Sequence, residues 1–315
     1  MVTHSVDDRR PTLVTRLYVA GMWAARDKRA FEGAARTLRT ARARQRAGDR
    51  PPTPWTRLRT RTSSDRRHGM TTWTVWPRRA RPVVRVLYLH GGGYVHPLTV
   101  DYWRLARALV RTPAEVVVPA YPLAPDAGVD DVLPLLEDLA AELVTGELPV
   151  VLMGDSAGGA LVLEVARALA DRGTPPAHVV GLSPWLDATL DEREVADLEA
   201  TDPMLAESGL RAAGRWWAAP YAPGHPRVSP VGLDLAGLPP ITVHVGDRDI
   251  LRPAVDRLLD RARVAHAIVH LHEVTAMFHV WMTRPLPEAR RTRRQIVHLL
   301  RRVATGPTLR SRDGL

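Results

Sequence analysis

Short runs rich in Val, Ile and Leu alternate with segments of helical periodicity along most of this chain. Continuous apolar strands that alternate with helices are typical of a mostly parallel β-sheet covered by helices on both faces. The strand-like runs span residues 58–62, 71–76, 83–90, 115–121, 148–154, 178–185, 241–247 and 267–274. The helical segments span residues 13–47, 102–111, 130–145, 159–172, 253–265 and 288–303. We therefore expect an α/β fold, and 315 residues fit a single large domain of this class.

Composition excludes several classes of protein. The chain contains no cysteine, which excludes disulfides, thiolate metal sites and a cysteine nucleophile. The formal net charge is +10, but the basic residues are spread along the chain without interleaved aromatic residues, so we expect no nucleic-acid partner. The apolar runs are too short to span a bilayer, and the first 29 residues lack a signal-peptide pattern. These features predict a cytoplasmic protein, with a loose tail at residues 306–315.

The segment MGDSAGGA, residues 153–160, sets Ser156 between two glycines at the spacing G-x-S-x-G. A buried strand precedes it and a helix follows. Because they lack Cβ atoms, Gly154 and Gly158 permit a sharp strand-to-helix turn with the serine in a strained backbone conformation. The start of the helix then presents the amide of Ala157 to negative charge near the serine oxygen. The pattern favours a nucleophilic serine, and the alternative is a tight turn with a spectator serine.

A second glycine motif, LHGGGY at residues 89–94, follows the predicted strand at residues 83–90. Three consecutive glycines leave their amides unshielded, so that two of them can point at one oxygen, as in the HGGG turns of lipases and esterases. The alternatives are a flexible loop and a phosphate-binding turn, but the spacing of a dinucleotide-binding fingerprint is absent. The two glycine motifs together, each after a buried strand, favour a hydrolytic site.

An activated serine needs a base and an acid. Where the serine lies on a strand-to-helix turn of this kind, the acid follows it in the sequence and the histidine comes after the acid. His279 follows the last predicted strand, at the edge of the sheet where α/β sites are built. Asp247 and Asp249 both follow the strand before it, and the spacing does not choose between them. The histidines near the last strand have no supporting carboxylate spacing, so we expect no metal site there.

These residues belong to a longer series of motifs. With them, the chain resembles the hormone-sensitive-lipase-like family of bacterial α/β-hydrolase esterases over roughly residues 70–284. The motifs, in family order, are HGGGY (90–94), YPLAP (121–125), GDSAGG (154–159), LSPWLD (182–187), DPML (202–205), GLPP (237–240), GDRDIL (246–251) and MFHVW (277–281). The chain departs from many relatives at Asp155, where they carry Glu, and at residues 252–254, where they carry acidic residues.

The resemblance implies a catalytic triad and an oxyanion hole. Ser156 would be the nucleophile, His279 the base and Asp249 the acid. The backbone amides that would hold the oxyanion are those of Gly91, Gly92 and Ala157. Neither a metal nor an organic cofactor is implied.

The resemblance also implies an α/β-hydrolase fold with a helical cap over a mostly parallel central sheet flanked by helices. The cap would comprise approximately residues 1–50 and 185–230, and the core approximately residues 55–184 and 231–305. Apolar residues suited to a substrate pocket are Tyr94, Trp185, Leu186 and Phe278, with Trp216, Trp217 and Tyr221 in the insertion. The alternative is that the aromatic residues of the insertion only pack the cap onto the core.

The function that follows from these expectations is hydrolysis of carboxylic esters with short- to medium-chain acyl groups, through an acyl-serine intermediate. The partner would be a small-molecule ester, and an exposed edge strand would support a homodimer. The alternative is a deacetylase or amidase that acts on an acylated peptide or secondary metabolite. A more distant alternative is a non-catalytic ligand receptor on the same fold.

Overall fold

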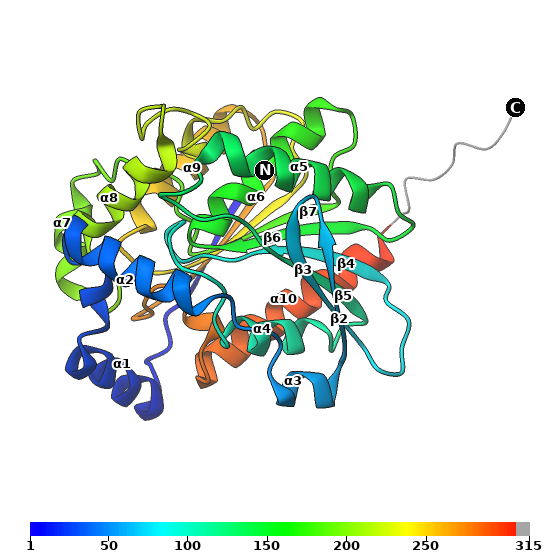
Figure 1. Cartoon of the computed structure of the whole chain (residues 1–315), viewed down its shortest axis with the longest axis horizontal. Helices are drawn as coiled ribbons and strands as arrows, with labels where there is room; N and C mark the ends of the chain where they lie inside the picture. The colour runs from blue at the N-terminus through cyan, green and yellow to red at the C-terminus, as the bar shows by residue number, and fades with distance from the viewer. Residues whose placement is uncertain (307–315) are drawn as a thin grey trace, which may run out of the picture.

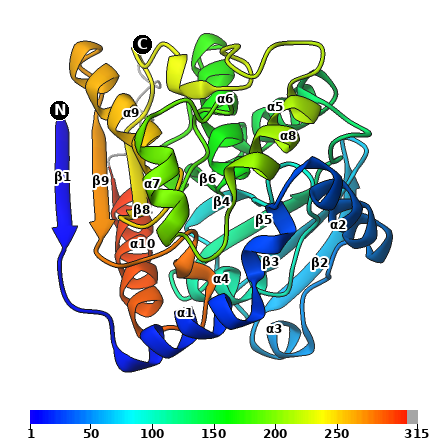
Figure 2. The same ribbon diagram turned by 90° about the vertical axis from the view of Figure 1, so that its left-hand side faces the viewer.

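The structure is a computed structural model, and it describes residues 1–306. Nine strands form one sheet in the order β1-β9-β8-β7-β6-β4-β5-β3-β2 (Figures 1 and 2). The strands are β1 (Val2–Asp7), β2 (Arg61–Arg67), β3 (Met70–Trp76), β4 (Val84–Leu89), β5 (Ala114–Ala120), β6 (Val150–Asp155), β7 (His178–Leu182), β8 (Ile241–Gly246) and β9 (Val269–Val274). In this order, each neighbouring pair between β1 at one edge and β5 is parallel. Strand β3 then pairs antiparallel with β5, and β2 pairs antiparallel with β3 at the other edge.

Helices cover both faces of the sheet, as the alternation of apolar strands and helices predicts (Figure 1). On one face lie α5 (Val129–Val144), α6 (Ala157–Asp171) and α9 (Arg252–Val264). On the other face lie α4 (Tyr102–Leu109) and α10 (Pro287–Thr305). The central strands are buried along their whole length, which explains their continuous apolar sequences.

Two segments that are distant in sequence gather at one side of the molecule, left in Figure 1. Their helices are α1 (Leu13–Ala25), η1 (Asp27–Phe31), α2 (Ala34–Ala47), α7 (Glu194–Thr201) and α8 (Glu207–Ala218). The backbones of η1 and α8 pack closely, because a Cβ atom on Gly209 would overlap the carbonyl oxygen of Phe31. The remaining short helices are α3 (Pro54–Arg59), η2 (Pro230–Gly232) and η3 (Trp281–Thr283).

Three expectations from the sequence differ from this structure. The segment 13–47 is not one helix, because Arg26 adopts a left-handed conformation (φ 56°) and Gly33 has φ 76° before α2 begins. Residues 58–60 are not strand: Thr53 caps α3 by accepting from the amide of Thr56 (3.2 Å), and a proline starts the helix. The strand β1 was not predicted, and it adds residues 2–7 to the sheet rather than to a helical cap.

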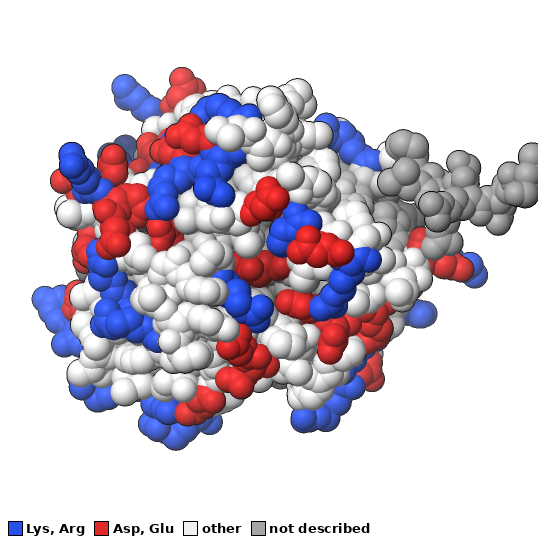
Figure 3. Space-filling view, turned by 90° about the horizontal axis from the view of Figure 1, so that it is seen from above, with Lys and Arg blue, Asp and Glu red and all other residues white. Residues whose placement is uncertain are grey.

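Two further observations bear on the class of protein. None of the helices in residues 1–306 is long and apolar enough to cross a membrane. Figure 3 shows acidic side chains among the basic ones on the face seen from above Figure 1, so the excess positive charge does not form a uniform surface there. The tail expected at residues 306–315 lies, from residue 307 onward, outside the described part of the chain.

Candidate active site

The serine motif forms the turn that its glycines predict. Ser156 joins β6 to α6 with φ 51° and ψ −121°, a conformation that costs energy for a residue with a side chain. A Cβ atom on Gly154 would overlap the carbonyl oxygen of Gly158, and one on Gly158 would overlap that of Leu89. Both glycines are therefore required by close backbone packing. The Ser156 side chain is 4% exposed and lines a cavity.

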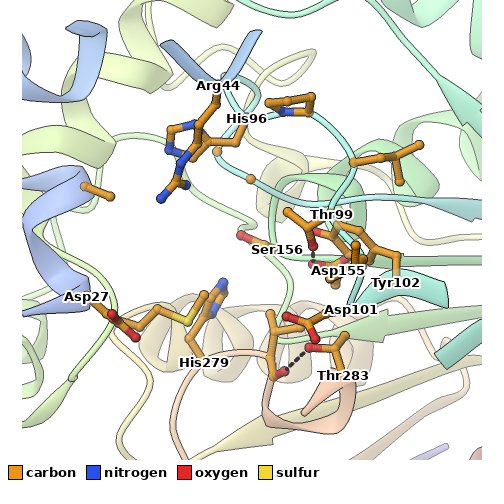
Figure 4. Close-up of a pocket in the computed structure, with 18 of the residues that line it drawn as sticks. Asp27, Arg44, His96, Thr99, Asp101, Tyr102, Asp155, Ser156, His279 and Thr283 are labelled. Atoms are coloured by element: carbon orange, nitrogen blue, oxygen red, sulfur yellow. Dashed lines mark hydrogen bonds between the residues drawn. The ribbon is translucent and has the colours of Figure 1, made fainter. Parts of the chain in front are cut away.

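His279 comes from the loop after β9 and lines the same cavity as Ser156 (Figure 4). Its Nδ1 atom lies 2.9 Å from Oδ2 of Asp249, and both side chains are almost completely buried. Asp249 Oδ1 accepts a hydrogen bond from the amide of Leu251 (3.0 Å). The second oxygen is thus free to accept from the imidazole, as a triad requires. Among the hydrogen bonds of the described residues, none joins Ser156 to His279, and both side chains face one space.

The structure distinguishes the two aspartates that the sequence left open. Asp247 accepts a hydrogen bond from the amide of Ala276 (2.6 Å) and so supports the loop that carries His279. Asp249 contacts the imidazole itself. The amide of Val280 donates to the hydroxyl of Ser183 (3.1 Å), which fixes the other end of this loop.

A second buried carboxylate, that of Asp202, lies beside Asp249. It accepts from the amides of Met204 (2.7 Å), Leu205 (3.0 Å) and Ile250 (3.2 Å). Burial, and then the charge of Asp249, raise the pKa of Asp202 to about 6. Sequence reasoning gave Asp202 no role, although the DPML motif that contains it was a signal.

The negative charges around His279 and its burial have opposite effects on its pKa. Burial lowers the pKa of the imidazole, but the charge of Asp249, its hydrogen bond, and the charges of Asp202 and Asp155 outweigh that effect. The net result is a raised pKa for His279. This arrangement stabilises the imidazolium that forms when the ring accepts a proton.

The carboxylate of Asp155 organises the glycine turn. It accepts from the hydroxyl of Tyr88 (2.6 Å), the amide of Gly91 (2.9 Å) and the hydroxyl of Tyr102 (3.3 Å). Burial raises the pKa of Asp155 to about 6, against the hydrogen bonds that lower it. A Cβ atom on Gly91 would lie 2.8 Å from the Cβ of Ser156, so only glycine lets the turn approach the serine.

This contact corrects one expectation about the oxyanion hole. The amide of Gly91 donates to Asp155 and so does not point at the cavity, and the prediction that it holds the oxyanion is wrong. Gly92 and Gly93 both line the cavity, and both have positive φ angles (103° and 63°). Ala157 is the first residue of α6, whose amide has no partner within the helix. Gly92, Gly93 and Ala157 are thus the candidate donors.

The cavity has a volume of about 490 Å³. It lies between the strand ends and residues of η1, α2 and α8, and Figure 4 shows part of its lining. Its apolar lining includes Ala30, Phe31, Leu98, Val100, Met204, Leu205 and Leu210. Sequence reasoning predicted none of these.

The predicted pocket residues Tyr94, Trp185, Leu186 and Phe278 are not among the residues that line this cavity. All four are at most 1% exposed. The ring of Tyr94 stacks on Trp217 (4.4 Å between centroids) and packs against Trp185 (5.3 Å). Of the aromatic residues of the insertion, Trp185 and Trp217 therefore pack against the tyrosine that follows the glycine turn. Trp216 and Tyr221, the other two, also lie outside the cavity lining.

Within residues 1–306, no group of three or more His, Asp or Glu side chains is arranged to hold a metal ion. Near the last strand, His272 instead stacks on His244 (4.9 Å between centroids) and lies 2.7 Å from the hydroxyl of Ser5.

Known proteins resemble this chain in sequence and in fold. Residues 86–283 match the model of a family described as having the alpha/beta hydrolase fold. An acetyl-hydrolase of Streptomyces hygroscopicus is 35% identical over 246 residues, which cover 75% of this chain and 81% of that protein. An esterase of Acinetobacter venetianus is 30% identical over 217 residues, 65% of this chain and 70% of that protein.

Among solved structures, an esterase from the bacterial hormone-sensitive lipase family is 28% identical to this chain, with a TM-score of 0.79. The match covers 94% of this chain and 100% of the esterase. The chain therefore belongs to the α/β-hydrolase fold family, and within it to the esterases of the bacterial hormone-sensitive lipase type.

Proposed function

We propose that this chain hydrolyses carboxylic esters through an acyl-serine intermediate, with Ser156, His279 and Asp249 as the catalytic triad. The observation that carries the proposal is the buried contact between His279 Nδ1 and Asp249 Oδ2 in a cavity that Ser156 also lines. The esterase and acetyl-hydrolase relatives support the same reaction class.

The reaction begins when Ser156 Oγ attacks the ester carbonyl carbon and His279 Nε2 takes the hydroxyl proton. Asp249 orients the imidazole through Nδ1 and stabilises its positive charge. The tetrahedral intermediate collapses with cleavage of the carbon–oxygen bond, and His279 gives the proton to the leaving alcohol. His279 then removes a proton from water, which attacks the acyl-serine and releases the acid.

The oxyanion in both steps would be held by the amides of Gly92, Gly93 and Ala157. Each such donor contributes roughly 3 kcal/mol to the stability of the transition state, because it points at charge that develops only there. The amide of Gly91 would contribute indirectly, because its hydrogen bond to Asp155 holds the glycine turn in position.

The substrate would be an ester with a short- to medium-chain acyl group, since the cavity of about 490 Å³ is bounded by Phe31 and Leu210. A panel of 4-nitrophenyl esters from acetyl to dodecanoyl checks this, with kcat/KM expected to fall at the longest chains.

The central experiment replaces the nucleophile. Ser156→Ala should abolish turnover of 4-nitrophenyl butanoate, and a fluorophosphonate probe should label the unaltered protein but not the variant. Persistent turnover in the variant would remove Ser156 as nucleophile. A lack of labelling of the unaltered protein would favour the alternative that the chain is a non-catalytic ligand receptor.

A second candidate is a deacetylase or amidase activity on an acylated peptide or secondary metabolite; one relative is named acetyl-hydrolase, which is compatible with removal of acetyl groups. The same site serves either leaving group, because His279 can protonate an amine as well as an alcohol. Comparison of 4-nitrophenyl acetate with 4-nitroacetanilide separates the two activities.

The proposal also includes a homodimer and a cytoplasmic location. Strand β1 supports the dimer, because it ends the described sheet and its outer edge is available for pairing. Sedimentation equilibrium and fractionation of the source cells test these two points.

A further inference from the structure

The cap side of the cavity carries a guanidinium group. Arg44 projects from α2 into the lining, and within residues 1–306 it makes no hydrogen bond or ion pair. Arg284, also in the lining, contacts Asp101, and Arg42 on the same helix contacts Asp126. Arg50 is a further arginine of the lining whose side chain makes no hydrogen bond or ion pair within residues 1–306. A guanidinium that faces a cavity without a partner is available to a ligand.

The imidazole of His96 lies next to Arg44 (Figure 4). His96 is 4% exposed, and neither of its ring nitrogens has a hydrogen-bond partner within residues 1–306. Burial, and then the charge of Arg44, lower the pKa of His96 to about 3, so the ring is neutral and keeps one N–H donor. Buried polar atoms without partners cost free energy, which a ligand that supplies a partner recovers.

His96 is held beside Arg44 by contacts of its ring and its backbone. The His96 ring packs edge-on against Phe31 (5.2 Å between centroids), and its backbone amide donates to the carbonyl of Gly92 (3.0 Å). The cluster therefore begins in the turn that supplies the candidate oxyanion donors. Figure 4 shows Ser156 between this cluster and His279. Asp27 also lines the cavity, and its negative charge acts on the Arg44 guanidinium.

We propose that Arg44 and His96 bind a carboxylate of the substrate, so that the preferred esters carry a carboxylate remote from the bond that is cleaved. This inference rests on the ester hydrolysis proposed above. The planar guanidinium matches a carboxylate with two parallel hydrogen bonds, which a neutral alkyl group does not offer. Arg44 is exposed, whereas His96 is buried, so the carboxylate would bind where the mouth of the cavity meets its interior.

The experiment compares matched esters. Mono-4-nitrophenyl glutarate carries the charge on the acyl group, and 4-nitrophenyl pentanoate is its neutral counterpart. For charge on the alcohol, 4-acetoxybutanoate is compared with pentyl acetate. The unaltered protein should show a higher kcat/KM for the anionic member of at least one pair. Arg44→Met should lower that anionic-to-neutral ratio about tenfold or more, and Arg44→Lys should retain part of it.

The matched control is Arg46→Met, which removes a positive charge from the same helix outside the cavity lining and should leave the ratio unchanged. An equal ratio in the unaltered protein and Arg44→Met, for both pairs, would overturn the carboxylate site while leaving ester hydrolysis in place. Equal losses in Arg46→Met and Arg44→Met would also overturn it, because a general effect of net charge would then explain the ratio. Absence of turnover of every ester would instead overturn the proposed function itself.

Discussion

The carboxylate of Asp202 accepts a hydrogen bond from the amide of Ile250 (3.2 Å), the residue that follows Asp249. Asp202 follows α7 and precedes α8, whereas Asp249 follows β8 of the sheet. This hydrogen bond therefore joins the segment between α7 and α8 to the loop that holds the proposed catalytic acid. The charges of both carboxylates act on the imidazole of His279 and raise its pKa.

The first prediction concerns the charge of Asp202. Asp202→Asn removes an anion that raises the pKa of His279, so the imidazole should stay neutral, and active as a base, at lower pH. The acidic limb of the kcat/KM profile should therefore move toward lower pH. A profile that stays in place, or moves upward, would show that Asp202 acts only through the position of the loop.

The second prediction concerns Asp249. Asp249→Asn leaves a group of similar shape but removes the charge that stabilises the imidazolium and fixes its tautomer. We expect kcat to fall by about 10³ to 10⁴. Asp247→Asn is the matched control, since its side chain bonds the amide of Ala276 rather than the imidazole, and it should cost far less activity. The reverse order of effects would assign the acid to Asp247.

The third prediction concerns the support of the glycine turn. Tyr88→Phe removes a buried hydrogen bond of 2.6 Å to Asp155 and should lower the free energy of unfolding by about 1–3 kcal/mol. Tyr102→Phe removes a longer bond of 3.3 Å to the same carboxylate from a less buried ring, and should cost less. Urea unfolding of the three proteins at pH 7.5 gives the comparison. Equal stabilities would mean that Asp155 does not depend on Tyr88.

The fourth prediction concerns acid stability. His244 is 1% exposed, and burial lowers its pKa to about 3, whereas in the unfolded chain its pKa is about 6.5. Between these values the unfolded chain binds a proton that the folded protein does not, so the free energy of unfolding must fall as the pH drops. From pH 7.5 to pH 5 this histidine alone accounts for about 2 kcal/mol.

Urea unfolding at the two pH values tests this origin. His244→Phe should reduce the loss of stability between pH 7.5 and pH 5, because the titrating group is gone. His298→Gln, which removes an exposed histidine, should leave the loss unchanged. An unchanged loss in His244→Phe would place the acid sensitivity elsewhere, for example at His178, whose pKa burial lowers to about 4.

The buried strands were predictable because their sequences are apolar without interruption. Strands β6 and β8 begin and end within two residues of the predicted runs. Strand β1 was not, since its residues are mostly polar and exposed, and only its pairing with β9 makes it a strand. Local sequence does not encode a partner that lies more than 260 positions away.

The site was predictable where chemistry needs a particular residue type. The glycines around Ser156 are required by backbone contacts, and the order of acid and histidine follows the fold. The oxyanion donors were harder to predict from the sequence, because which glycine amide faces the cavity depends on where the Asp155 carboxylate lies. The pocket residues were harder still, since a large apolar residue such as Trp185 has the same sequence signal in a core as in a cavity wall.

The pairing of β1 with β9 has a consequence for how the protein is made. The residues of β1 leave the ribosome long before the strand that they pair with, residues 269–274, because more than 260 residues separate the two strands. During that interval β1 has no native partner, and its backbone groups are open to association with other chains. Translation speed and chaperones at the ribosome should therefore influence the yield of this protein more than its final stability would suggest.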